Sequence, residues 1–130
     1  MTKGQIPYVI VFCLYMAAVL YLCFAKPDDV PTIEVSFFGI PFDKVAHFIM
    51  FLPYPFLAFK ALDTEGLKSC RRILLPGIVL TGACMAAMTE FIQSRISYRS
   101  ADAYDLAADF LGISIGVIAV IIYHIIRKNK

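Results

Sequence analysis

The feature that most constrains this chain is its set of four apolar stretches, which together take up most of the sequence. Most of them approach the ~20 residues that cross the ~30 Å hydrocarbon core of a bilayer. Hydrophobic residues make up 60% of the 130 residues and charged residues only 17%, which is too apolar for a soluble domain of this length. We therefore predict an integral membrane protein with spans at residues 6–24, 45–59, 73–92 and 106–126.

The second stretch differs from the others because it is short and contains Pro53 and Pro55. A proline inside a helix lacks the N–H of one backbone hydrogen bond, and it kinks the helix unless neighbouring groups satisfy the freed carbonyl. The first stretch has no Ala-x-Ala cleavage pattern and is longer than a signal peptide core, so it is read as a retained helix.

The predicted fold is an all-α, four-helix transmembrane bundle that forms one domain over residues 1–130. Residues 32–38 alternate between polar and apolar side chains and lie among prolines and glycine. This pattern predicts a short extended or hairpin-like extracytoplasmic loop after the first helix, with Phe37, Phe38 and Phe42 at the lipid interface.

The distribution of basic residues predicts the orientation of the bundle. With a cytoplasmic N-terminus, eight Lys and Arg residues fall on the cytoplasmic side and only Lys26, Lys44, Arg95 and Arg99 fall outside. The positive-inside rule then places both termini in the cytoplasm. The lipid bilayer is the expected partner, and the net charge of +2 indicates no nucleic-acid surface.

Ionisable residues gather at the predicted outer ends of three spans. Asp43 stands where the second helix should begin, and it can cap that helix. His47 lies one turn further on the same face, where the Asp43 carboxylate can orient its ring. Glu90 and Gln93 end the third span, and an acid there opposes the helix dipole, so it needs a proton or a cation. The candidate cations are Lys44, His47, Arg95 and Arg99.

The fourth span begins with acids and continues with glycines on one stripe. Asp102 and Asp105 precede or open the helix and can cap it, while Asp109, Gly112 and Gly116 follow helical spacing. The glycines favour close packing against another helix of the same chain. Arg99 can either pair with one of these acids or grip an anion.

No cofactor or metal site is predicted. The four cysteines lack metal or redox spacing. A site built from His47, Glu90, Asp105 and Asp109 is chemically conceivable, but its single histidine does not follow a known zinc motif.

These motifs together resemble the VanZ-like family of membrane proteins: Asp43-Lys44-x-x-His47-Phe48, then Glu90-x-x-Gln93, then Arg99 followed by Asp102, Asp105, Asp109, Gly112 and Gly116. The resemblance implies a small protein of the bacterial inner (cytoplasmic) membrane. The founding member of the family is associated with resistance to the glycopeptide teicoplanin. The family commonly has Asn where this chain has Asp109.

Three hypotheses about function follow. The first is a polar pocket at the outer membrane face that binds an anionic headgroup, a cell-wall precursor or a glycopeptide antibiotic. Its ligand-binding residues would be Lys44, His47, Glu90, Gln93, Arg99, Asp102, Asp105 and Asp109. The second is an intramembrane enzyme in which His47 is the general acid or base, Asp43 orients it and Glu90 is the complementary acid. The third is a structural salt-bridge network without a ligand.

Overall fold

The computed structural model describes residues 3–26, 36–63, 71–96 and 101–129. The helices in these ranges are α1 (Ile6–Phe24), α2 (Phe42–Phe51), α3 (Tyr54–Leu62), α4 (Arg71–Gln93) and α5 (Ala103–Lys128). Since α2 and α3 together form one apolar segment, Phe42–Leu62, four segments are long and apolar enough to cross a membrane. The predicted all-α membrane fold is confirmed, with the second and fourth helical segments beginning three residues earlier than expected.

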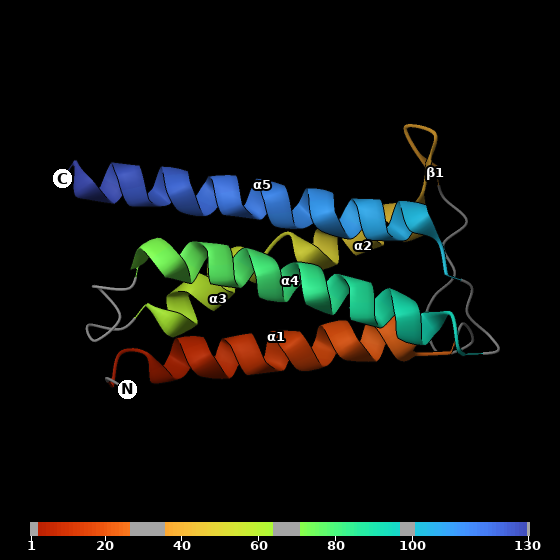
Figure 1. Ribbon diagram of the computed structural model, residues 1–130, viewed down its shortest axis with the longest axis horizontal. Helices are drawn as coiled ribbons and strands as arrows, with labels where there is room; N and C mark the ends of the chain where they lie inside the picture. Colours follow the sequence, from red (N-terminus) through yellow and green to blue (C-terminus); the bar gives the residue numbers. More distant parts are fainter. Residues whose placement is uncertain (1–2, 27–35, 64–70, 97–100, 130) are drawn as a thin grey trace.

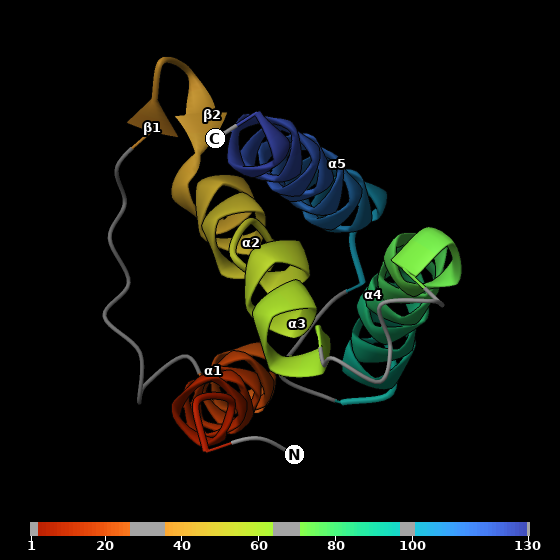
Figure 2. The same ribbon diagram turned by 90° about the vertical axis from the view of Figure 1, so that its left-hand side faces the viewer.

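The second span lies at the centre of the bundle. Figure 2 shows α2 and α3 running between α1 and α5, with α4 beside them. α2 packs on α5, while α3 contacts α1, α4 and α5. Phe51 of α2 is fully buried, and on α3 Tyr54 and Ala58 are buried. Large apolar side chains on the outward faces of the other spans, such as Leu14 and Ile118, stay exposed, as expected where lipid is the solvent.

The two ends of the described chain lie at the same end of the bundle (Figure 1). The ends of α1 and α4 and the starts of α2 and α5 therefore meet at the opposite end. This opposite end is called the site end below, because it carries the ionisable residues singled out in the sequence.

The predicted proline kink is a complete break between α2 and α3. α2 ends at Phe51, and α3 begins at Tyr54 directly after Pro53. A break leaves backbone carbonyls without helical partners. The hydroxyl of Tyr15 on α1 donates a hydrogen bond to the freed Met50 carbonyl, so a neighbouring helix supplies the missing donor.

The break between α2 and α3 packs directly on Gly112 and Gly116 of α5, as the sequence predicted. A Cβ atom added at Gly112 would lie 2.6 Å from the Phe48 carbonyl oxygen, and one added at Gly116 would lie 2.8 Å from Cδ of Pro55 and also meet the Leu52 carbonyl. No side chain fits at such distances. The backbones of α5 and the second span therefore touch directly, which close packing in a bilayer requires.

A two-residue antiparallel ladder precedes α2. Strand β1 (Ser36–Phe37) pairs with β2 (Ile40–Pro41), with Ser36 opposite Pro41. The turn residues Phe38 and Gly39 both have positive φ, 52° and 79°, which matches the tight turns of hairpins. Phe38 is 95% exposed at the tip. Residues 32–35 of the predicted extended segment lie outside the described residues.

Candidate functional site

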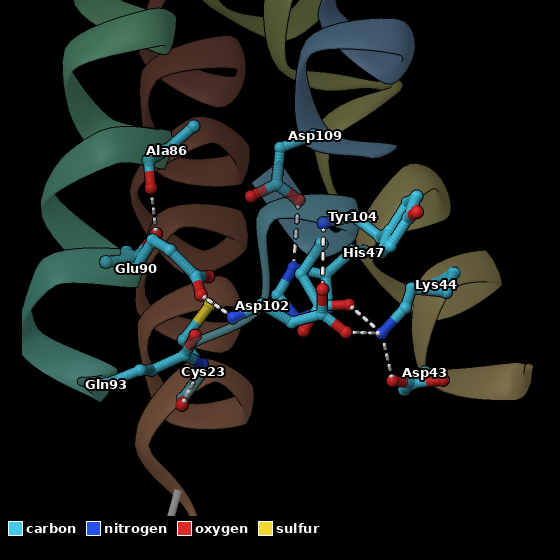
Figure 3. A network of polar contacts seen from close by, with 12 residues as sticks. Cys23, Asp43, Lys44, His47, Ala86, Glu90, Gln93, Asp102, Tyr104 and Asp109 are labelled. Atoms are coloured by element: carbon cyan, nitrogen blue, oxygen red, sulfur yellow. Dashed lines mark hydrogen bonds and ion pairs between the residues drawn. The ribbon is translucent and has the colours of Figure 1, made fainter. Parts of the chain in front are cut away.

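Lys44 is the centre of an ion cluster at the site end (Figure 3). Its ammonium nitrogen lies 2.7 Å from Oδ2 of Asp43, 2.6 Å from Oδ2 of Asp102 and 2.7 Å from Oδ1 of Asp105. The Lys44 side chain is only 17% exposed. The first turn of α2 is thus joined to the start of α5 by one cation with three anionic neighbours.

His47 lies one turn deeper and contacts α5 on two sides. Its Nδ1 is 2.9 Å from Oδ1 of Asp109, and its Nε2 is 3.7 Å from Oδ2 of Asp105. The predicted orienting acid was Asp43, but the Asp43 carboxylate contacts Lys44. Helical spacing correctly placed Asp43 and His47 on one face, whereas the partner of the ring comes from another helix.

Asp43 also differs from its predicted role as a helix cap. α2 begins at Phe42, its cap residue is Pro41, and no side chain caps it. Asp43 lies in the first turn, where its charge is still favoured by the positive end of the helix dipole.

Among the described residues, Glu90 has a backbone partner and forms no ion pair with the candidate cations Lys44, His47 and Arg95. Its Oε1 accepts a hydrogen bond from the backbone N–H of Asp102. Its Oε2 is buried and has no hydrogen-bond partner within the described ranges. Arg95 lies over the ring of Phe91, 5.1 Å from its centre. Arg99, the remaining candidate, lies outside the described residues.

Asp102 caps α5, as the sequence predicted. Its Oδ1 accepts a hydrogen bond of 2.9 Å from the backbone N–H of Tyr104. The hydrogen bond from Lys44 to its other oxygen holds the pKa of the Asp102 carboxyl below its usual value. Asp102 therefore has three roles: its side chain caps α5 and pairs with Lys44, and its backbone N–H donates a hydrogen bond to Glu90.

Gln93 reaches α1, and within the described residues no hydrogen bond joins its side chain to the ion cluster. Its amide nitrogen donates a 2.7 Å hydrogen bond to the Cys23 carbonyl, near the end of α1. The carbonyls of the last helical turn lack helical partners, so this bond fixes the end of α1 against α4. Cys23 is itself buried, and the role of its backbone carbonyl has no signal in the sequence.

Acidic groups outnumber cations in this network. The carboxylates are Asp43, Glu90, Asp102, Asp105 and Asp109, and the cationic or protonatable partners within the described ranges are Lys44 and His47. The ligand atoms of Asp43, Asp102 and Asp105 lie within 4.8 Å of one another, a spacing that suits a metal ion. The Lys44 ammonium already bonds all three.

Comparison with known proteins places the chain in a family. No solved structure matches it. A protein of Schizosaccharomyces pombe named "Uncharacterized protein C11E3.10" is 30% identical over 120 residues, which cover 92% of this chain and 66% of that protein. This chain thus spans just under two thirds of the relative's length. The VanZ/LLP1 family model matches residues 12–127. This four-span integral membrane protein therefore belongs to the VanZ/LLP1 family.

Proposed function

We propose that this protein binds the polar group of a lipid or lipid-linked molecule at the site end of the bundle. The observation that carries the proposal is a connected network of buried ionisable groups from three spans, in which Glu90 Oε2 and Asp109 Oδ2 have no hydrogen-bond partner in the described part of the chain. An acid that serves only to join helices would have both oxygens satisfied.

Depth within the membrane supports a lipid ligand. Asp109 is fully buried, more than one turn inside the first residue of α5, and Glu90 is 8% exposed. Ionisable groups in a spanning helix cost roughly 2.5 to 3.5 kcal/mol at its centre, and they commonly mark substrate or ion sites. A headgroup is the polar chemistry that a bilayer always presents at its interface.

The expected ligand classes are a membrane headgroup, a cell-wall precursor and a glycopeptide antibiotic. The similarity to a fission yeast protein favours a ligand that bacterial and fungal membranes share. Fungi have no peptidoglycan, so a phospholipid headgroup or a lipid-linked sugar fits both. We place the protein in the bacterial cytoplasmic membrane with the site end outward, following the basic residues in the sequence.

Native mass spectrometry of the purified protein tests the proposal. The wild type should retain a defined lipid class through delipidation, and Asp109→Asn should release it while the protein stays folded. Asp63→Asn, which removes a carboxylate at the other end of the second span, is the control and should retain the lipid. Equal retention of every lipid class by the wild type and Asp109→Asn would contradict the proposal.

A second candidate function is acid–base chemistry on a lipid-linked substrate. It is favoured by the 2.9 Å contact of His47 Nδ1 with Asp109, because an acid at one ring nitrogen fixes the tautomer and raises the basicity of the other. The carboxylate that orients the base is then Asp109 in place of Asp43. Conversion of a labelled lipid extract by the wild type, lost in His47→Gln at normal abundance, would establish this function.

A further inference from the structure

We infer that the group bound at this site is a primary ammonium, such as the amine of an ethanolamine headgroup. The inference rests on the proposed function and names its ligand class. It reverses the expectation of an anionic ligand, which depended on Lys44 and Arg99 as free anion contacts. Within the described ranges, Lys44 is bonded by three carboxylates, so it offers no unshared charge to an anion.

The charge balance is the first argument. Five carboxyl groups lie together with one lysine and one histidine, so the acidic groups of the described network outnumber its cations even when His47 is protonated. Buried charges of like sign repel strongly in a medium of low dielectric constant. An anionic headgroup would add to this repulsion, whereas a cation would relieve it.

The unpartnered oxygens are the second argument. Asp109 is 0% exposed and Glu90 8% exposed, yet Oδ2 of Asp109 and Oε2 of Glu90 have no hydrogen-bond partner in the parts of the chain that the structure describes. In Figure 3 the free oxygen of Asp109 lies on the side of that carboxylate nearer α4, the helix that carries Glu90. A positively charged hydrogen-bond donor would satisfy these two buried carboxylate oxygens and offset the surplus of acidic groups around them.

The neighbouring cluster shows how this chain binds such a group. The ammonium of Lys44 is itself a primary amine, and it forms ion pairs with three carboxylates at 2.6 to 2.7 Å, two of them hydrogen-bonded. An ammonium with three N–H donors can satisfy several acceptors without a fixed coordination geometry. A metal ion fits less well, because the described acids spaced for one are Asp43, Asp102 and Asp105, which already surround Lys44.

Lipid competition in nanodiscs tests the inference without any change to the protein. Nanodiscs would contain phosphatidylcholine mixed with phosphatidylethanolamine, its N-methylated derivatives or phosphatidylglycerol. We expect the lipid bound to the wild type to be enriched in phosphatidylethanolamine over phosphatidylcholine by roughly tenfold, the ratio that one charge-assisted hydrogen bond supports. Enrichment should fall with each N-methylation, since every methyl group removes an N–H donor.

Variants then assign the enrichment to the site. Glu90→Gln and Asp109→Asn should each lower the enrichment to near one, and Asp63→Asn should leave it unchanged. Free ethanolamine added to phosphatidylcholine nanodiscs identifies the source of the amine. We expect phosphatidylethanolamine to raise the melting temperature of the protein. If free ethanolamine raises it equally, the ligand is a soluble amine; if only the lipid raises it, the ligand is a headgroup. Both results support ammonium recognition.

Other outcomes overturn the inference in ways that separate it from the proposed function. Enrichment of phosphatidylglycerol that Glu90→Gln abolishes would leave lipid binding intact and refute the amine. No enrichment of any lipid in the wild type would refute the proposed function as well. Equal retention of all lipids together with an unchanged melting temperature in Glu90→Gln would show that the acid is simply protonated.

Discussion

The ammonium nitrogen of Lys44 lies 2.7 Å from Oδ1 of Asp105, and this ion pair joins the start of the second span to the first turn of the fourth. Asp43 and Asp102 share the same ammonium. Because both helices contribute acids, the cation neutralises repulsion between helices as well as within them. The stability of the site end should therefore depend on Lys44 more than on any one of its acids.

Lys44→Met keeps the length of the side chain and removes its charge. The change leaves three carboxylates together without their cation, so we expect a loss of about 3 to 5 kcal/mol of unfolding free energy, the usual cost of breaking a largely buried ion pair. The measurement is thermal or denaturant unfolding in detergent. Lys128→Met, an exposed lysine in the last turn of α5, is the matched control and should change stability by less than about 0.5 kcal/mol.

A second substitution checks that the loss comes from uncompensated charge. Asp105→Asn in the Lys44→Met background should restore part of the lost stability, because it removes one of the repelling carboxylates. Additive losses in the double variant would show that packing of the lysine stem, rather than its charge, carries the effect.

The stability of the protein should fall in acid partly through Asp102. Its pKa is lowered in the folded state by the hydrogen bond from Lys44, so the unfolded state binds more protons at low pH. This contribution is fully present above the unfolded value of about 3.9 and is lost as the pH falls through the lower folded value. Melting temperatures between about pH 5 and 2 should decline less steeply for Asp102→Asn than for the wild type. If the melting temperatures of the wild type and Asp102→Asn fall equally with decreasing pH, the sensitivity to acid comes from other groups.

Gly116→Ala should destabilise the bundle because its new methyl group would meet the Leu52 carbonyl and the ring of Pro55. Overpacking at such a contact costs typically 1 to 3 kcal/mol. Gly77→Ala on α4 is the control, since a Cβ there has nothing within 4 Å. It should be neutral or stabilising, because alanine favours a helix by up to about 1 kcal/mol over glycine. A lower melting temperature for Gly77→Ala than for Gly116→Ala would contradict the observed packing.

The orientation remains a prediction from the basic residues, and cysteine accessibility can measure it. In a variant without the four native cysteines, Ser36→Cys at the site end should react with a membrane-impermeant maleimide in intact cells. Asp63→Cys at the other end should react only after permeabilisation. The reverse pattern would put the site end in the cytoplasm.

The sequence was sufficient for the features that follow from composition and spacing. The spans follow from apolar length, the break from Pro53 and Pro55, and the packing role of Gly112 and Gly116 from their four-residue spacing. The cap at Asp102 also follows from a local rule. Each of these depends on residues within one turn or one span.

The partners of His47 and Glu90 could not be read from the sequence in the same way. Helical spacing identified Asp43 as a neighbour of His47, but the relative rotation and depth of α2 and α5 decide that Asp109 contacts the ring. One oxygen of Glu90 accepts the backbone N–H of Asp102, the residue directly before α5, which is close in space but twelve residues away in the sequence. A backbone donor leaves no residue-type signature.

The shortness of α2 sets the depth of the ion cluster. Its 10 residues span about 15 Å, roughly half the hydrocarbon thickness, from the first turn that holds Lys44 to the break seated on the α5 glycines. The inner end of α2 is held in place by its packing on Gly112 and Gly116, so the length of α2 sets the position of Lys44. One residue inserted between Lys44 and the break would raise the lysine by about 1.5 Å and turn it by about 100° away from α5. The segment between Lys44 and the proline break should therefore tolerate substitutions far better than insertions or deletions.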